Sequence, residues 1–404
     1  MDETVTILGA PGHVLPRSME ARLADMGGNA GNLIFQHAVA RLIADPQVHL
    51  GGAGVPWEDA VHLTTARARV FPAANHLRTG ADWSNLADFL DRDGPPLVVL
   101  GLGVQAESAA DATATAARLR ADPEARRLAE VLGRRAAAIT VRGTFSREVC
   151  SALGIRGTRP LGCPSILIHP DPHLGLGLAA ELDRLTAMLG GQGSRVRAVM
   201  SAAAPFEIHG DETRVALEQR LFSWIVADLA GLYLQQSGGA VSLRAAAGQW
   251  QGLTEGTRRS LRRILAPDLA EADLAGHLLR GGRAPHDARL WIADLAGRDL
   301  VIGTRVHGVL AAIAAGRPGV LIPHDARTAE LARTHHLPLL EARDVLDAPD
   351  LGAALARVRF DPLAFDRARR ASAVGLVAMF GRLGLTPAPA VQRLATSARS
   401  ECAA

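Results

Sequence analysis

The stretch DLVIGTRVHGVLAAIAAGRP, residues 299–318, decides the fold expected of this chain. Its residues 300–302 form a short apolar run that predicts a buried strand, and Gly-Thr follows directly. A helix of small residues then opens with Arg305 and His307 in its first turn. A strand that passes through a short loop into a helix is the unit from which parallel sheets are built, so the stretch predicts α/β architecture.

Comparable apolar runs recur along the chain, and most of them precede an amphipathic or alanine-rich segment. This alternation predicts parallel sheets with helices between the strands. In such folds, binding residues collect at the carboxyl ends of the strands. The clearest further runs are residues 4–8, 97–100, 137–141, 196–200 and 320–322.

The chain has 404 residues, which is too long for one ordinary core and predicts two domains. A composition break rich in Pro and Gly lies between residues 170 and 193. We therefore expect an N-terminal Rossmann-like domain over residues 1–178 and a C-terminal one over residues 190–360. Residues 361–384 should form a helix, and residues 385–404 a flexible tail.

Lysine is absent, so all 44 basic residues are arginine. Schiff-base chemistry and a P-loop are thereby excluded, because both need a lysine. An anion site in this chain must use arginine, histidine, backbone amides or a metal. The net charge is only +3 and the basic residues are dispersed, which predicts no nucleic-acid partner.

Hydrophobic residues make up 48% and charged residues 21% of the sequence, as is typical of a soluble globular protein. The three cysteines are too far apart for a metal knuckle and imply no disulfide framework. The first residues do not have the pattern of a signal peptide, and no apolar stretch approaches 18 residues, so no membrane span is expected. These features favour a cytoplasmic location.

The start of the helix after residues 300–302 is the first candidate site. A helix N-terminus presents free amide donors and a positive dipole end, which favour an anion. Arg305 adds a planar fork suited to a carboxylate or phosphate, and His307 can exchange a proton near neutrality. The alternative is that Arg305 makes a structural salt bridge and His307 fills space.

Three other loops are weaker candidates. The strand at residues 137–141 ends in Arg142 and leads to a helix that carries Ser146, although Arg142 could instead form a salt bridge between domains. The glycine-rich turn at residues 27–32 could expose amides to a ligand, or serve only as a turn. Cys163, in a loop at the end of a strand, could be a nucleophile, but buried cysteines are commonly inert.

The run at residues 101–106 formally fits a dinucleotide fingerprint. The next strand comes about 35 residues later and ends in Arg142 rather than in an acid, which argues against NAD, although an arginine could suit NADP. Trp57, Trp83 and Trp250 are candidates for stacking against a sugar, with core packing as the alternative role of each.

Several of these segments, in this order, resemble the polysaccharide pyruvyl transferase family. The resemblance covers about residues 28–340, and its most specific element is Arg305-Val306-His307-Gly308 followed by an alanine-rich helix and Gly-Arg-Pro. The other matching segments are Gly28-Asn29-Ala30-Gly31-Asn32, Val141-Arg142 with Ser146, Leu153-Gly154-Ile155 and Gly162-Cys163-Pro164-Ser165.

The resemblance implies a GT-B-like fold, in which two Rossmann-like parallel-sheet domains face each other across a cleft and a C-terminal helix crosses back. It implies transfer of a pyruvyl group from phosphoenolpyruvate to two hydroxyls of a sugar or lipid-linked glycan acceptor, with no cofactor and no metal required. His307 would be the general acid, and Arg142 and Arg305 would hold the anionic donor. The remaining substrate-binding residues implied are Asn29, Asn32, Ser146, Thr304, Gly308, His324 and Arg327.

Two positions depart from the family pattern. Arg327 stands where the family commonly has a lysine; it keeps the charge but cannot donate a proton, so His324 would have to supply one if it is needed. Asn32 stands where the family's early loop often has an aspartate. These departures leave two alternatives open: a GT-B-like glycosyltransferase with a nucleotide-sugar donor, or a non-catalytic member of the family. The sequence indicates no oligomeric state.

Overall fold

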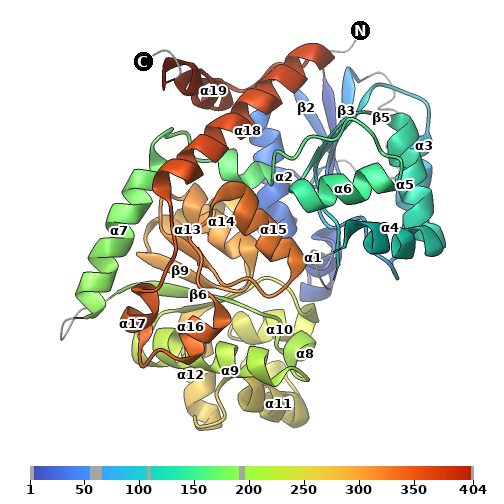
Figure 1. Ribbon diagram of the computed structural model, residues 1–404. Helices are drawn as coiled ribbons and strands as arrows, with labels where there is room; N and C mark the ends of the chain where they lie inside the picture. Colours follow the sequence, from blue (N-terminus) through green and yellow to red (C-terminus); the bar gives the residue numbers. More distant parts are fainter. Residues whose placement is uncertain (1–3, 55–65, 107–110, 191–195, 402–404) are drawn as a thin grey trace.

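Two five-stranded parallel sheets organise the chain (Figure 1). The computed structural model describes residues 4–54, 66–106, 111–190 and 196–401, with the side chains of residues 398–401 left out. The first sheet has the order β2 (Gln47–Leu50), β1 (Val5–Leu8), β3 (Ala68–Pro72), β4 (Leu97–Leu102), β5 (Ala136–Val141). The second has the order β10 (Gly319–Leu321), β9 (Leu300–Gly303), β6 (Ala198–Ala202), β7 (Leu232–Gln235), β8 (Gly282–Arg283).

Every strand pairing within the two sheets is parallel. The first sheet has the doubly wound order 2-1-3-4-5, and the second, read from its other edge, has the Rossmann order 3-2-1-4-5. In both orders the strand sequence reverses beside the first strand, which here is β1 in one sheet and β6 in the other. The prediction of a GT-B-like α/β fold with two Rossmann-like sheets is confirmed.

All six strands predicted from apolar runs are present, and four further strands were missed. The missed strands are β2, β3, β7 and β8. The strand β2 is half-exposed, β3 contains Arg69 and ends on Pro72, and β8 has only two residues. These three strands therefore lack the continuous apolar run that identifies a buried parallel strand, whereas β7 is fully buried and its apolar run, Leu232 to Leu234, was overlooked.

Helices cover the first sheet and connect its strands. The helix α2 begins at Gly31, as the glycine-rich turn predicts, and packs against α14 of the other half. The helices of this half are α1 (Met19–Asp25), α2 (Gly31–Leu42), α3 (Ser84–Asp91), α4 (Ala112–Ala121), α5 (Pro123–Arg135) and α6 (Thr144–Ala152).

The connection between the two sheets differs from the predicted boundary. After a 3-10 turn at Pro164–Leu167, the chain forms α7 (Leu174–Leu189), a continuous helix that packs against both α17 and α18. The expected end of the first domain at residue 178 thus falls inside a helix. Pro170 and Pro172 both lie before the first residue of α7, so no proline interrupts the helix. Leu178, Leu182 and Leu185 form its buried face.

The second half contains the helix predicted after residues 300–302, which is α14 (Val306–Ala314) and is buried along its whole length. The other helices of this half are α8 (Pro205–Ile208), α9 (Glu212–Leu221) with a π-helical extension at Phe222–Asp228, α10 (Gly239–Ala246), a 3-10 turn at Trp250–Gly252, α11 (Glu255–Leu265), α12 (Glu271–Gly281), α13 (Ala288–Ala296), α15 (Ala326–His335), α16 (Ala342–Leu346) and α17 (Leu351–Leu355).

The long helix α18 (Pro362–Leu383) confirms the helix expected over residues 361–384, and it crosses back from the second half to the first (Figure 1). One apolar cluster contains Ile7 of β1, Leu310 of α14 and Met379 of α18. Beyond α18, the Thr386 backbone N–H donates to Asp45 Oδ2 at 2.7 Å, and the Thr386 hydroxyl donates to Asp45 Oδ1 at 2.9 Å. These contacts fasten the C-terminal segment to the first half.

The expected flexible tail is wrong for most of its length. Residues 389–401 form α19 (Pro389–Glu401), which packs along α18. Val391, Leu394 and Ala395 are buried at helical spacing, so this segment has an apolar stripe despite its polar composition. Residues 402–404 lie outside the described residues.

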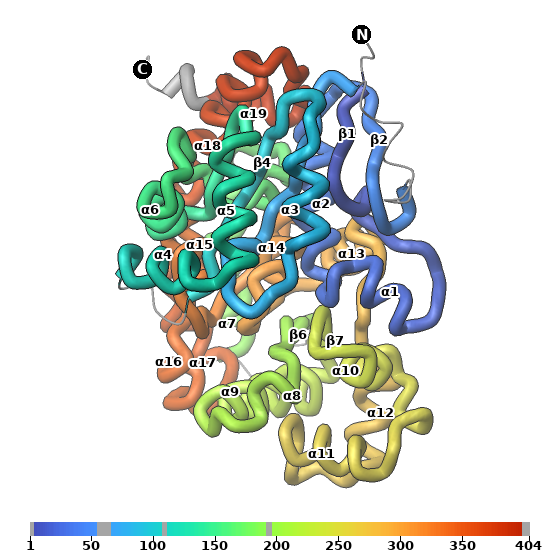
Figure 2. Tube along the Cα trace, turned by 90° about the vertical axis from the view of Figure 1, so that its right-hand side faces the viewer, coloured from blue at the N-terminus to red at the C-terminus, as the bar shows by residue number. Residues whose placement is uncertain are grey.

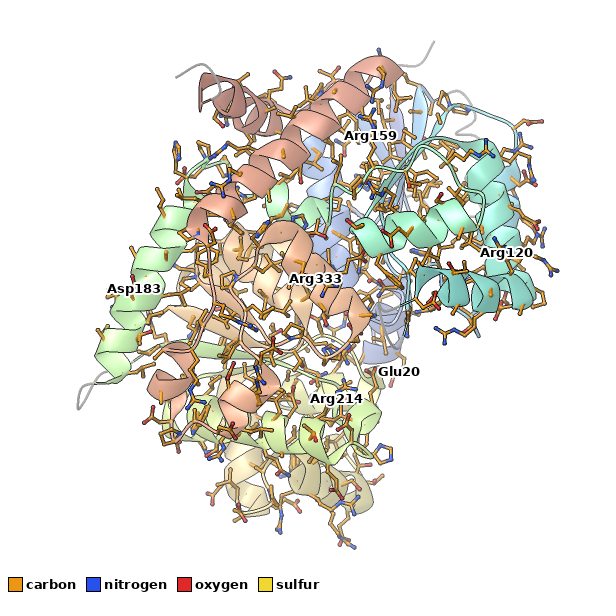
Figure 3. All side chains as sticks on the ribbon, viewed as in Figure 1. Glu20, Arg120, Arg159, Asp183, Arg214 and Arg333 are labelled. Atoms are coloured by element: carbon orange, nitrogen blue, oxygen red, sulfur yellow. The ribbon has the colours of Figure 1, made fainter. Side chains whose placement is uncertain are left out.

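The two halves also meet directly. Figure 2 shows the first half stacked on the second, with α14 between them, and Figure 3 shows Glu20 of α1 at the junction. Arg244 of α10 forms an ion pair with Glu20 across this junction. None of the described helices has the length and apolarity that a membrane crossing needs.

Candidate functional site

A small polar cavity lies between the carboxyl ends of the two sheets and has a volume of about 60 Å³. Its lining brings together most of the residues singled out from the sequence, although they are spread over almost 300 positions. From the first half come Asn29, Asn32, Ala74, Asn75 and Arg142. From the second come Gln236, Thr304, Arg305, Val306, His307, His324, Arg327, Thr328 and Leu331.

The loop between β9 and α14 places three of these side chains. Gly303 ends β9 with φ +154°, and a Cβ there would lie 2.2 Å from the Ser201 carbonyl oxygen. Only glycine fits this close approach. The chain can therefore turn sharply so that Thr304, Arg305 and His307 enter the cavity at the start of α14.

His307 is almost completely buried at the junction of the halves. Its Nε2 lies 4.0 Å from Cys163 Sγ, and its ring centroid lies 5.5 Å from that of Phe35. Burial, together with the charges of Arg142 and Arg327, holds the pKa of His307 well below its usual value. The imidazole is therefore neutral at pH 7 in the protein alone.

Arg142 carries a buried positive charge, and no carboxylate in the described part of the chain forms an ion pair with it. The side chain is only 2% exposed. Its Nε donates to the Gly101 carbonyl oxygen at 3.2 Å and its Nη1 to Asn75 Oδ1 at 2.8 Å, both of which are neutral acceptors. Burial lowers the pKa of Arg142, and the guanidinium nevertheless stays charged because arginine side chains keep their proton in proteins. A buried cation held by neutral oxygens favours an anionic ligand.

The glycines of residues 101–106 have a structural explanation in Arg142. A Cβ at Gly103 would lie 2.7 Å from Arg142 Cδ and 2.9 Å from Asn75 Oδ1. The Gly101 carbonyl accepts from the same arginine. The segment that formally fits a dinucleotide fingerprint thus makes room for Arg142 at the end of β4.

Arg305 and Thr304 are held by two different acids. Arg305 Nη2 forms an ion pair with Glu207 Oε2 at 2.5 Å, and Glu207 is half exposed. The Thr304 hydroxyl donates to Glu218 Oε1 at 2.9 Å, and the Ala203 backbone N–H donates to Glu218 Oε2 at 3.0 Å. Burial raises the pKa of Glu218 to about 7, although both hydrogen bonds oppose the shift.

Arg327 and His324 flank the cavity from the loop that leads into α15. Arg327 Nη2 lies 2.8 Å from Asp325 Oδ2, and Asp325 also caps α15 through the Thr328 backbone N–H at 2.8 Å. Burial alone would raise the pKa of Asp325, but Arg327 and the capping bonds hold it below its usual value. Burial lowers the pKa of His324 to about 4, so His324 is neutral at pH 7.

The glycine-rich turn before α2 forms the opposite wall. The Asn29 side chain accepts from the Gly31 backbone N–H at 2.8 Å, and Asn32 Nδ2 donates to the Met26 carbonyl at 2.8 Å. A Cβ at Gly31 would lie 2.9 Å from His307 Nδ1 and 2.8 Å from Gln236 Nε2. Glycine at this position therefore sets how closely the two halves approach at the site.

Two predicted binding residues do not line the cavity. The Ser146 hydroxyl and backbone N–H both donate to the Glu330 carboxylate at 2.7 Å, and this serine is fully buried. Gly308 faces β6, where a Cβ would lie 2.1 Å from Ser201 Oγ. Ser146 thus joins α6 to α15, and Gly308 allows α14 to pack on the sheet.

Sequence reasoning missed three polar residues of the lining: Thr328, which lies in the first turn of α15, and a pair, Asn75 and Gln236. Each of this pair follows a missed strand, Asn75 after β3 and Gln236 after β7. The carboxyl end of a parallel strand is where binding residues collect, so recognising these strands would have identified both residues.

Three polar atoms of the lining residues are buried without a hydrogen-bond partner among the described residues. They are Gln236 Oε1, Arg305 Nε and His324 Nδ1. Buried polar groups in folded proteins are almost always paired, so unpaired ones that converge on one cavity indicate a ligand. In the described part of the chain, no group of three or more His, Cys, Asp or Glu side chains is placed to share a metal ion.

A second, larger cavity of about 400 Å³ adjoins the first. Residues of both linings form the boundary between the two cavities: Asn29, Asn32, Ala74, Asn75 and Arg327. Trp83 lines the larger cavity, Trp250 is buried in the core of the second half, and Trp57 lies outside the described residues.

The fold and the cavities define an α/β protein with two Rossmann-like halves and an arginine-rich pocket where they meet. No protein family matches the sequence, and no curated protein matches it either. Solved structures that match include the crystal structure of Anabaena Alr3699/HepE in complex with UDP and glucose. The match covers 100% of both chains at 14% sequence identity with a TM-score of 0.40.

Proposed function

We propose that this chain transfers the pyruvyl group of phosphoenolpyruvate to two hydroxyls of a sugar, forming a cyclic ketal in glycan synthesis. One observation carries the proposal. The small cavity is lined by Arg142, Arg305 and Arg327, while none of its described lining residues is an aspartate or glutamate. Three guanidinium groups around one small space suit a compact ligand that carries more than one negative charge.

Phosphoenolpyruvate meets this requirement because it carries a carboxylate and a phosphate on adjacent parts of a small molecule. The volume of about 60 Å³ admits a group of the size of a phosphate. The rest of the donor would reach the boundary with the larger cavity. The reacting carbon would then lie where an acceptor in that cavity can attack it.

The reaction balances with this chain's own residues and no further reactant. A proton adds to the methylene carbon of the donor, and one sugar hydroxyl attacks the adjacent carbon as it becomes electron-poor. The bond from that carbon to the phosphate oxygen then breaks, and the second hydroxyl attacks the same carbon. Of the two hydroxyl protons released, one replaces the proton given to the methylene carbon, and the other leaves with inorganic phosphate.

In this scheme His307 gives the first proton. Its low pKa in the protein alone follows from burial and from Arg142 and Arg327. A bound anion offsets those positive charges and raises the pKa of His307. Protonation of His307 is thereby coupled to donor binding, so the acid forms only when the donor is present.

Arg327 serves in this scheme as a donor-binding charge. Its guanidinium is held by Asp325 at 2.8 Å. His324 has a pKa of about 4, which makes it an acceptor or donor of hydrogen bonds rather than an acid at pH 7. The replacement of lysine by Arg327 is then compatible with turnover.

Ligand-induced stabilisation tests the proposal. Phosphoenolpyruvate should raise the Tm of the protein, while UDP-glucose, UDP and pyruvate should leave it nearly unchanged. A shift with UDP-glucose and none with phosphoenolpyruvate would replace the proposal with a glycosyltransferase. No shift with any of these ligands would favour a non-catalytic protein.

A second measurement tests turnover. Release of inorganic phosphate from phosphoenolpyruvate is followed with and without a panel of methyl glycosides. We expect release to depend on the glycoside and the product to have gained a carboxyethylidene group by mass spectrometry. Release at the same rate without a glycoside would show hydrolysis instead of transfer.

A further inference from the structure

We propose that the larger cavity is the acceptor subsite and takes an uncharged hexopyranoside, with Asp25, Gln36 and Trp83 bonding its hydroxyls. The proposal rests on the proposed function for the reaction, but the binding it asserts is independent of that reaction. Neither Asp25 nor Gln36 belongs to a sequence motif described above.

The position of the cavity in the fold is the first argument. Its lining includes Leu8, Gly9 and Ala10 at the end of β1, and Ala74 and Asn75 beyond the end of β3. These two strands flank the point at which the order of the first sheet reverses. Crevices at that point are the usual ligand sites of doubly wound sheets.

The size of the cavity is the second argument. Its volume of about 400 Å³ compares with about 60 Å³ for the arginine-rich cavity. Small-molecule sites commonly have about 300–1,000 Å³, so the larger cavity admits a sugar ring. The shared boundary, which includes Asn29, Asn32 and Asn75, lets the two ligands meet.

Polar atoms without hydrogen-bond partners in the lining indicate which kind of ligand the cavity would bind. Asp25 Oδ2, Gln36 Oε1 and Trp83 Nε1 are buried and lack a hydrogen-bond partner among the described residues, and all three residues line this cavity. Of the three atoms, Asp25 Oδ2 also has an ion-pair contact, with Arg17 Nη1 at 3.9 Å. Two of these atoms accept hydrogen bonds and one donates. A sugar hydroxyl both donates and accepts, so a polyol satisfies all three, whereas an inorganic anion could satisfy only the indole N–H.

The charges of the lining favour an uncharged sugar. Asp25 is the only acid among the described lining residues, and its Oδ2 forms an ion pair with Arg17 Nη1 at 3.9 Å, so this carboxylate adds no unpaired charge to the cavity. The two arginines of the lining have other contacts: Arg327 pairs with Asp325 and also lines the donor cavity, and the Arg78 guanidinium carbon lies 5.0 Å from the Trp83 ring centroid. A neutral glycoside therefore needs no further charge from this cavity.

Binding of sugar alone tests the subsite. Saturation-transfer NMR with methyl glucoside, methyl galactoside and methyl mannoside is performed on the whole protein, without phosphoenolpyruvate. We expect transfer to at least one of these hexosides and little to methyl glucuronide. Tighter binding of the glucuronide than of every neutral hexoside would overturn the proposal, as would the absence of transfer to all of them.

Two near-isosteric variants place the bound sugar. Gln36→Leu removes the acceptor, and Trp83→Phe removes the indole N–H but keeps an aromatic ring. We expect each to raise the Kd of the hexoside about threefold to tenfold and to leave the Kd of phosphoenolpyruvate within about twofold. Unchanged hexoside affinity in both variants would contradict the assignment.

Trp291→Phe is the matched control, because Trp291 Nε1 is also buried and unpaired while Trp291 lines neither cavity. Its hexoside affinity should equal that of the wild type. If the sugar binds as expected but phosphoenolpyruvate does not, the result supports the acceptor subsite and contradicts the proposed reaction. If phosphoenolpyruvate binds and the hexosides do not, the subsite falls and donor binding stands.

Discussion

The loop after β5 and the loop after β9 both contain an arginine and a glycine before a helix, and they hold their arginines in different ways. Arg142 and Gly143 lie between β5 and α6, whereas Gly303 ends β9 and Thr304 and Arg305 precede α14. In the first, Arg142 is buried and bonded to neutral oxygens. In the second, Arg305 pairs with Glu207, whose side chain is half exposed.

Under the proposed function, this difference predicts that the arginines of the two halves contribute unequally to donor binding. Arg142 provides a fixed charge that only a ligand can neutralise, so it should dominate donor affinity. Arg305 must share its charge between Glu207 and the donor, so it should contribute less. The helix after this loop begins with Val306 and His307, so under the proposed function the chemistry belongs to the loop after β9.

The largest expected effect comes from His307→Asn, which tests whether chemistry belongs to the loop after β9. Removing a general acid typically lowers kcat by about 10²–10⁴-fold. The Kd of phosphoenolpyruvate, measured by calorimetry, should change less than about threefold, because the arginines remain. His324→Asn is the control, with a much smaller loss of kcat. Near-normal turnover of His307→Asn would show that another group donates the proton.

The second prediction concerns pH and the acid behind Thr304. The ordinary pKa of a glutamate is 4.5, and burial raises that of Glu218 to about 7. The folded chain therefore binds this proton more tightly than the unfolded chain, and the free energy of unfolding falls as pH rises from 4.5 to 7. This fall amounts to at most about 3 kcal/mol.

Glu218→Gln should remove that fall, because glutamine does not titrate. Urea unfolding at pH 4.5, 5.5, 6.5 and 7.5 would measure it as the difference between wild type and variant. At pH 4.5 the variant should have a lower free energy of unfolding than the wild type, because the amide NH₂ of glutamine cannot accept one of the two hydrogen bonds that the Glu218 carboxyl accepts. By pH 7.5 this difference in the free energy of unfolding should be smaller. A constant difference over this range would mean that Glu218 titrates normally.

The third prediction compares the two arginines directly. Arg142→Gln should raise the Kd of phosphoenolpyruvate about 100-fold, and Arg305→Gln about tenfold, because hydrogen bonds to charged groups contribute about 1.5–3 kcal/mol. Arg142→Gln should also leave Tm unchanged or higher, since it removes a buried charge without a carboxylate partner. Equal losses of affinity in the two variants would remove the distinction between the loops.

The smallest effect is expected for Ser146→Ala in the loop after β5. The variant loses the 2.7 Å bond from the Ser146 hydroxyl to Glu330 but keeps the bond from the backbone N–H. Its free energy of unfolding should fall by about 1 kcal/mol, with donor affinity unchanged. A loss of donor affinity would instead support the prediction from the sequence resemblance that Ser146 binds substrate.

Sequence reasoning reached the site through strands with continuous apolar runs. Residues 300–302 were recognised because a strand buried on both faces is apolar throughout, and residues 137–141 because their run is apolar except for Thr140. The ends of these two strands supplied Arg305, His307 and Arg142. The strands β3 and β7 were not recognised, and Asn75 and Gln236 were lost with them. The pairing of Ser146 with Glu330 spans 184 positions, so no local pattern could indicate it.

The helix α18 has a consequence for the integrity of the molecule. Because the chain leaves the second half and returns to the first, α18 and α19 pack against the first half although they follow the second half in sequence. A proteolytic nick within α7 would divide the chain into two polypeptides, and α18 and α19 would remain covalently bound to the second half while they hold the first half through non-covalent contacts. The nicked protein should therefore stay assembled and keep its arginine pocket, which depends on both halves.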